Sequence, residues 1–396
     1  MSILVAIIGL SILVIFHEFG HFLAAKLCGV GVLEFSVGMG PRLFSHVWHN
    51  TRYSLKLLPF GGSCAMLGED AAGSGDFETA SGTEMSDDEL DPWIDYDGVR
   101  FRKSALKDRS FNEKSAPRRF FICVAGVLNN FILAFLMAAV LVGFTGFDRL
   151  YVVGVQEDAP IAVAGLEKGD QVTGIGYTGK HISNMPSYRD LYIWLYVHAR
   201  EFTSDTELTI RYVRDGETKT LSTKPYYSTE NQKYMLGISF YGGRILPGNA
   251  LAFLQDTWYE FRYNVSMVVQ SLRMLAAGQV KRQEVMGPVG AVSVMGETVQ
   301  ESSQYGIFNA FLVLLELLVM LSANLGVMNL LPIPALDGGR LLFILCEMIF
   351  RKRLNPELEG KINAVGMAAL FALMVVIMGN DIINLVTGAY EEILNG

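Results

Sequence analysis

Apolar and polar residues are segregated along this chain, and four apolar runs are long enough to cross a lipid bilayer. The runs cover residues 2–27, 118–143, 308–331 and 362–388, and a membrane-spanning helix needs roughly 20 apolar residues. The first run lacks a basic leader and carries His17, Glu18 and His21 inside it, which disfavours a cleaved signal peptide. The pattern predicts a polytopic α-helical membrane protein with four transmembrane helices.

Basic residues indicate how these helices are oriented. Eight lysines and arginines lie in 100–119, before the second run, and four lie in 351–361, before the fourth. Short loops rich in lysine and arginine stay on the cytoplasmic side. We therefore expect both termini and the long segment 144–305 to be extracytoplasmic.

Residues 150–226 are predicted to form a compact α/β module. Strand-like runs at 151–155 and 171–177 alternate with helical spacing, and the dipeptide Asp215-Gly216 marks a hairpin between two further strands. The run from Ala159 to Asp170 has the pattern APxxxAGLxxGD and resembles the PDZ domains of bacterial proteases. A generic small α/β domain is the alternative. A PDZ domain implies a peptide ligand that adds as a strand.

Three other soluble segments have their own patterns. Residues 35–66 alternate and are punctuated by glycine, which predicts a membrane-associated β-hairpin region within 28–117. Residues 69–99 are acidic and poor in apolar side chains, which is typical of a mobile insertion. Residues 227–305 are predicted to be an extracytoplasmic amphipathic helical segment that lies on the outer surface. The third transmembrane helix and the motif after it are expected within 306–350.

Composition narrows the function classes. Hydrophobic residues make up 51% of the chain and charged residues 18%, against about 25% charged in soluble domains. The net charge of −8 argues against nucleic acid as a partner. None of the four cysteines lies in 144–305, so no disulfide framework is expected outside the cell.

The chemistry is concentrated in the first apolar run, where His17-Glu18-Phe19-Gly20-His21 is an HExxH motif. Histidines at i and i+4 of a helix share one face and bind one zinc ion, and the glutamate between them takes a proton from zinc-bound water. Ionisable groups inside a transmembrane helix are costly and usually functional. We therefore predict a zinc site with His17 and His21 as ligands and Glu18 as general base.

A third ligand is expected from Asp337. It follows Pro332 and Pro334, which interrupt the helix, and irregular backbone at membrane depth is tolerated where it is buried in protein or lines a wet cavity. A plain helix N-cap is the alternative role, and the two roles are compatible. Under the predicted orientation, His17 and Asp337 both lie toward the cytoplasmic side.

Together these motifs resemble the site-2 protease family of intramembrane zinc metalloproteases, of the bacterial RseP/RasP type with a single PDZ domain. The resemblance covers nearly the whole chain: HExxH in the first span, a PDZ-like module between the second and third, and an NxxPxPxLDG run from Asn329 to Gly338. It implies Zn²⁺ bound by His17, His21 and Asp337, with Glu18 as base. It also implies that Asn329 binds the substrate backbone or the developing oxyanion. The protein is further expected to lie in the cell membrane of a bacterium.

Several positions depart from the family pattern without touching the zinc set. Val127 replaces a proline in the second span, where Asn130 matches the family asparagine, and Arg340 replaces a histidine after the LDGG run. These departures leave substrate choice open. We expect Asn130 to contact the substrate.

A transmembrane substrate must be unwound before its peptide bonds are accessible. The alternating segment 53–58 follows the catalytic span, so we expect it to hold the substrate as an added strand, through Tyr53, Leu55 and Leu57. The predicted function is intramembrane proteolysis of single-span proteins, of the anti-sigma factor or remnant signal peptide type. A catalytically inactive PDZ-bearing scaffold or adaptor, or a transporter, are the alternatives.

Overall fold

The computed structural model describes residues 2–69, 93–96, 99–102, 110–229, 232–280, 285–352 and 356–387. The chain divides into two compact units. One comprises Met1–Met137 and Asn264–Gly396, and the other comprises Ala138–Tyr263.

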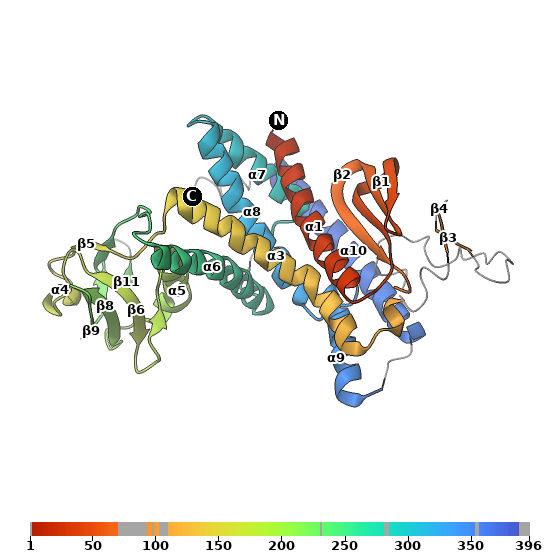
Figure 1. The fold of residues 1–396 in the computed structure, drawn as a ribbon. Coiled ribbons are helices and arrows are strands. Elements are labelled where there is room, and N and C mark those ends of the chain that lie inside the picture. Colours follow the sequence, from red (N-terminus) through yellow and green to blue (C-terminus); the bar gives the residue numbers. More distant parts are fainter. Residues whose placement is uncertain are drawn as a thin grey trace. The chain divides into compact units, whose positions relative to one another are not determined.

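Four helices are long and apolar enough to span a membrane, in agreement with the four predicted runs. They are α1 (Ser2–Leu27), α3 (Ala116–Thr145), α8 (Ile307–Leu330) and α10 (Pro356–Val386) (Figure 1). Many of their large apolar side chains are exposed, for example Ile8 on α1 and Val376 on α10. Such surfaces suit contact with lipid rather than water.

The predicted interruption after the third span is confirmed. Helix α8 ends at Leu330, with Leu331 as its C-cap residue. Helix α9 (Asp337–Phe350) begins six residues after Leu331. Pro332 and Pro334 lie in the gap, where proline removes a backbone donor. Ala335 has a φ of 74°, so the backbone turns sharply just before Asp337.

The predicted hairpin region forms a sheet after α1. Strands β1 (Val32–Trp48) and β2 (Thr51–Met66) both bend, at Gly38 and Gly40 in β1 and at Gly61 in β2, all of which have positive φ. Segment 32–39 pairs with both halves of β2, and segment 42–48 pairs with 51–58. The order across the sheet is therefore 42–48, 51–58, 32–39, 61–66.

Glu34 stabilises this sheet from within. Its side chain is fully buried and accepts hydrogen bonds from Arg42 and Ser54, with Arg52 3.3 Å away. Burial works to raise the pKa of Glu34, but the bonds from Arg42 and Ser54 outweigh it, and the pKa lies below its ordinary value.

The second unit contains the α/β module. An antiparallel sheet has the order β7 (Ser183–Asn184), β6 (Gln171–Tyr177), β8 (Leu208–Arg214), β9 (Glu217–Thr223). Helices α4 (Pro160–Val163) and α5 (Tyr188–His198), with the 3-10 turn η2 (Ala199–Glu201), complete it. Strand β5 (Val152–Val155) pairs with β12 (Ile238–Phe240), and Leu191, Trp194 and Leu208 lie in the shared core.

The module is longer than the predicted range 150–226. Strands β10 (Tyr226–Ser228), β11 (Lys233–Met235) and β12 follow β9, and β12 supplies the partner of β5. The prediction of a wholly helical segment over 227–305 is therefore wrong for its first part. Helices α6 (Ala250–Ala276) and α7 (Pro288–Ser303) account for most of the remainder.

Two smaller features complete the first unit. Strands β3 (Trp93–Tyr96) and β4 (Val99–Arg102) pair, and a 3-10 turn η1 (Phe111–Glu113) precedes α3. Most of the predicted acidic insertion, 70–92 and 97–98, lies outside the described residues. The N-terminus of α7 is capped by Asp381 of α10, whose fully buried carboxylate accepts from the amides of Gly287 and Gly290.

Candidate metal centre

Close packing of α1 against α3 brings the two histidines of HExxH to the inside of the first unit. Both are buried, at 9% exposed for His17 and 7% for His21. A Cβ on Gly20 would lie 2.4 Å from the carbonyl oxygen of Ala125, and one on Gly126 would lie 2.3 Å from Nε2 of His21. Only glycine fits at these two positions, so the glycine of the motif is a packing requirement.

Asp337 is brought to the histidines by the folded backbone between α8 and α9. A Cβ on Gly338 would meet the carbonyl oxygen of Leu331 at 2.1 Å, and one on Gly339 would meet that of Ile333 at 2.5 Å. The two glycines after Asp337 therefore let the start of α9 fold back against the proline-containing segment. This explains the LDGG sequence locally, since a side chain at either position would push the carboxylate away.

The three predicted ligands converge. Nε2 of His17 lies 3.0 Å from Oδ2 of Asp337, Nε2 of His21 lies 3.2 Å from the same oxygen, and the two Nε2 atoms are 3.2 Å apart. Ligand atoms about 2.0 Å from a tetrahedral zinc ion lie roughly 3.3 Å from one another. Among the described residues, Oδ2 of Asp337 is buried without a hydrogen-bond partner. The donor set therefore fits Zn²⁺.

Helix α3 orients both imidazole rings. Nδ1 of His21 lies 2.9 Å from the carbonyl oxygen of Ile122, which fixes the tautomer with its proton on Nδ1 and leaves Nε2 free to bind metal. The amide of Asn130 lies against Nδ1 of His17, with Nδ2 at 3.1 Å, and its Oδ1 is buried without a partner. Turning that amide over presents Oδ1 to the Nδ1 proton, as metal binding by His17 requires.

A cavity of about 360 Å³ adjoins the ligands and also contains Glu18 and Asn329 in its lining. Glu18 follows His17 on α1, and Asn329 lies in the last turn of α8. The predicted base, the predicted oxyanion donor and the three predicted ligands therefore share one cavity.

Two charged residues of the cavity wall form an ion pair that the sequence does not predict. Arg340, one turn after Asp337, forms an ion pair with Glu69, and both line the cavity. Arg340 was noted as a departure from the family pattern, but nothing in the sequence paired it with Glu69, 271 positions away. Ser63, Cys64 and Cys123 also line the cavity.

The structure places residues 53–55 of the predicted substrate strand inside the sheet rather than at its edge. Segment 53–58 contains Tyr53, Leu55 and Leu57, and residues 53–55 have strand partners on both sides, so the segment has no free edge there to accept a substrate. None of these three residues lines the cavity. In the described sheet, segment 61–66 forms the edge on the cavity side. Four of its residues line the cavity: Gly62, Ser63, Cys64 and Met66.

Asn130, which was predicted to contact the substrate, lines the same cavity. Its side chain is fully buried and lies against His17, and its carbonyl oxygen accepts from Ser322 of α8. These contacts favour orientation of a ligand over contact with a substrate.

Comparisons with known proteins agree with this geometry. The sequence model of Peptidase family M50 matches residues 5–373. A candidate zinc metalloprotease of Clostridium acetobutylicum is 30% identical over 386 residues, covering 96% of this chain and 97% of that protein. Another from Clostridium perfringens is 31% identical over 384 residues, covering 97% of this chain and 99% of the relative.

Among solved structures, part of this chain is similar to the PDZ domain of an SdrC-like protein from Listeria monocytogenes. The identity is 20%, the TM-score is 0.19, and the match covers 24% of this chain and 88% of that domain. This likeness is too weak to assign a fold. The match to the family and to full-length relatives, with the ligand geometry, decides the identity: the chain belongs to peptidase family M50, the site-2 protease family, and is a zinc metalloprotease.

Proposed function

We propose that this metalloprotease is an intramembrane endopeptidase that cleaves the transmembrane segments of single-span proteins. One observation carries the proposal: His17, Glu18 and His21 lie on α1, a helix of membrane-spanning length, and Asp337 begins the helix that follows α8, another such helix. A peptide bond that reaches this cavity must come from a segment that is itself in or at the membrane. The substrates are of the anti-sigma factor or remnant signal peptide type, as in regulated intramembrane proteolysis.

The roles of the residues follow from their chemistry. His17, His21 and Asp337 would hold a zinc ion, which would supply a Lewis acid for the scissile carbonyl and lower the pKa of a bound water. Glu18 takes the proton of the attacking water and passes it to the leaving amine. The side-chain amide of Asn329 donates to the carbonyl oxygen as negative charge develops on it.

Substrate is held as an added strand along 61–66, in place of the segment 53–58 expected from the sequence. The support for this revision is that 61–66 is at the edge of the sheet and four of its residues line the cavity. Backbone hydrogen bonds to an edge strand replace those that the substrate loses when its helix unwinds. Specificity for side-chain sequence is correspondingly low.

The α/β module is proposed to be a PDZ domain that acts on the extracytoplasmic side, as a size filter or a peptide sensor. In support, β12 pairs with β5 along one edge, and Phe240 at its end contacts Tyr188 of α5. An extended peptide beside β12 would meet the helix. The basic segments 100–119 and 351–361 support cytoplasmic loops, extracytoplasmic termini and cleavage near the cytoplasmic side of the bacterial cell membrane.

The test is co-expression with candidate single-span substrates, comparing the natural chain with Glu18→Gln. The variant keeps the shape of the side chain but removes the base, so zinc content should be unchanged and cleavage should fall by at least about 10²-fold. Equal cleavage by both chains would refute the role of Glu18. A catalytically inactive scaffold, the alternative above, predicts no cleavage by either.

A further inference from the structure

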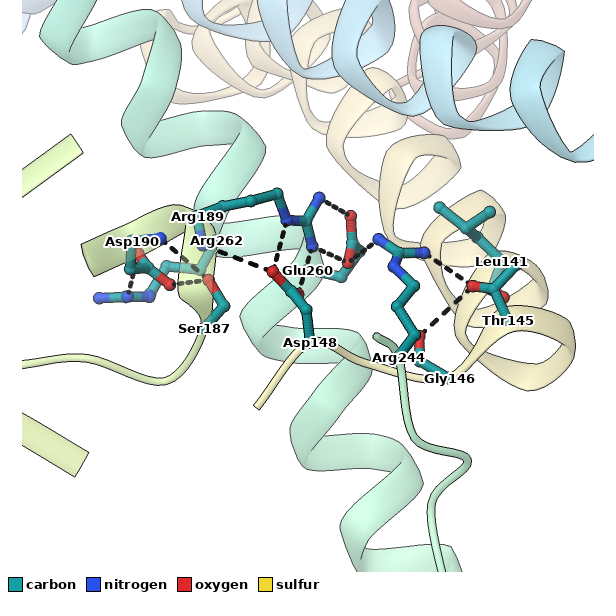
Figure 2. A network of polar contacts seen from close by, with 10 residues as sticks. All are labelled: Leu141, Thr145, Gly146, Asp148, Ser187, Arg189, Asp190, Arg244, Glu260 and Arg262. Carbon is teal, nitrogen blue, oxygen red and sulfur yellow. Dashed lines mark hydrogen bonds and ion pairs between the residues drawn. The ribbon is translucent and has the colours of Figure 1, made fainter. Parts of the chain in front are cut away.

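Glu260 of α6 is the centre of an ion-pair network in the second unit (Figure 2). Its side chain is fully buried, yet two arginines reach it. Arg189 of α5 donates to both carboxylate oxygens, at 2.9 and 2.5 Å, and Arg244 donates to Oε2 at 3.1 Å. Arg244 lies four residues after the end of β12, so helix α5 and the chain leaving β12 are both tied to one carboxylate.

The same arginines also bind the end of α3. Arg189 donates from Nε and Nη2 to the two oxygens of Asp148, at 3.1 and 3.0 Å, and Arg244 donates from Nη1 to Oγ1 of Thr145 at 2.7 Å. Thr145 is the last residue of α3, and Asp148 follows three residues later. We call Asp148, Arg189, Arg244 and Glu260 the quartet. Its two positive and two negative charges join α3, α5 and α6.

Neighbouring contacts hold the same surfaces together. Arg262 of α6 pairs with Asp190 of α5 at 3.0 Å, and Asp256 of α6 pairs with Arg149 at 2.7 Å. The amide of Tyr188, the first residue of α5, donates to the carbonyl oxygen of Asp148 at 3.0 Å. Each link therefore joins the module or its approach to α6 or to the residues that directly follow α3.

Burial makes this arrangement cooperative. A buried charge that loses its partner is strongly destabilising, whereas a complete network is not. The quartet therefore favours the one arrangement in which all four charges meet. A module joined only by flexible linkers would not need such a contact.

We propose that the quartet is a mount that fixes the module to the last turn of α3, and that Glu260 is thereby a positioning residue that determines substrate size. This inference rests on the proposed function, in which the module meets the extracytoplasmic part of a substrate. A fixed module excludes substrates with a bulky folded outer domain. A loosened module swings aside and admits them, while cleavage of substrates with short outer tails is unaffected.

The first arm of the test compares two substrates that share one transmembrane segment. One carries a folded outer domain and the other a short tail. In Glu260→Gln, and in the milder Arg244→Gln, the cleavage rate of the substrate with the folded domain, divided by that of the substrate with the short tail, should rise roughly tenfold. A change of about 1.4 kcal/mol produces this factor in a population ratio. The matched control is Glu167→Gln, since Glu167 is 68% exposed and forms a surface pair with Arg214.

The second arm measures the mount without activity. Spin labels are placed at Phe144→Cys and Tyr192→Cys, both exposed positions, in a full chain whose four native cysteines are replaced by alanine. The distance distribution should be narrow with the natural quartet and with Glu167→Gln. It should broaden in Glu260→Gln and Arg244→Gln.

The outcomes separate the two levels of the proposal. An unchanged distance distribution in both quartet variants overturns the mount. A broadened distribution with an unchanged cleavage ratio overturns the role in specificity. If the natural chain cleaves neither substrate, the proposed function fails, and the spin-label distances still decide whether the mount exists.

Discussion

The side chain of Asn130 lies against His17, with the amide nitrogen 3.1 Å from Nδ1, and it is closed off from solvent. Residues that bind the second nitrogen of a metal-bound histidine fix its tautomer and orientation, and their loss costs 10–100-fold in metal affinity. Asn130→Ala should therefore weaken zinc binding roughly 10–100-fold, measured by competition with a chelator.

The neighbouring residue provides the control for this prediction. Asn129 donates to the carbonyl oxygen of Phe16 rather than to a histidine, so Asn129→Ala should keep the natural zinc affinity. Equal affinities for all three chains would contradict the orienting role of Asn130.

Gly126 should tolerate no side chain. Its substitution by alanine would place a Cβ 2.3 Å from Nε2 of His21, which must displace the ligand atom itself. Gly126→Ala should therefore lose zinc, measured by elemental analysis of the purified chain. In Gly360→Ala, where nothing lies within 4 Å of the added Cβ, zinc content should stay natural, and loss of zinc in both variants would indicate a general effect on folding.

Cys64 offers a native probe of the substrate strand, because its side chain lies in 61–66 and lines the cavity. In a Glu18→Gln, Cys123→Ala background, which removes the other thiol of the cavity wall, a substrate with one cysteine near its cleavage site should form a mixed disulfide with Cys64 on oxidation. The cross-link should disappear in Cys64→Ala, as judged by non-reducing electrophoresis.

A thiol on the inner strand distinguishes the two strand assignments. Leu55 is 49% exposed but lies outside the cavity. With Cys64→Ala, the substitution Leu55→Cys should not restore the cross-link. Strong cross-linking at position 55 would instead favour the segment predicted from the sequence.

Asp170 should make the module sensitive to acid. Burial acts to raise the pKa of this carboxyl, but two hydrogen bonds from Arg214, each 2.7 Å, and one from the amide of Glu167 outweigh it and hold the pKa below its ordinary value. A lowered pKa contributes stability above the unfolded value of about 3.9 and loses it as pH falls through the folded value.

Arg214→Gln should therefore destabilise the module at neutral pH, because Asp170 loses its charged partner, and the difference from the natural chain should shrink below about pH 3.9. Hydrogen exchange of peptides from 208–223 in the full chain measures this. Lys219→Gln, which removes an exposed pair with Glu217 and a weaker attraction to Asp170, is the control and should show a smaller difference. A difference independent of pH would contradict the role of Asp170.

The sequence by itself determined the parts that depend on local pattern. Runs of about 20 apolar residues identify membrane helices because the bilayer has a fixed thickness. The spacing of His17 and His21 fixes a shared face because the helix has 3.6 residues per turn. Pro332 and Pro334 interrupt a helix wherever they occur. Each of these inferences uses neighbours in the chain, and the structure agrees with each.

Only the tertiary structure decided which distant segments meet. Segment 53–58 alternates like an edge strand, but the bends at Gly38, Gly40 and Gly61 fold both strands, and 61–66 takes the edge instead. Strand β12 completes the module from far along the chain, since Ile238 pairs with Val155 of β5, 83 residues earlier. Asn130 meets His17, and Arg189 meets Glu260, across similar gaps. The period of a strand or helix says which face of an element is buried, but it does not say against what, because the choice of partner is set by packing of the whole chain.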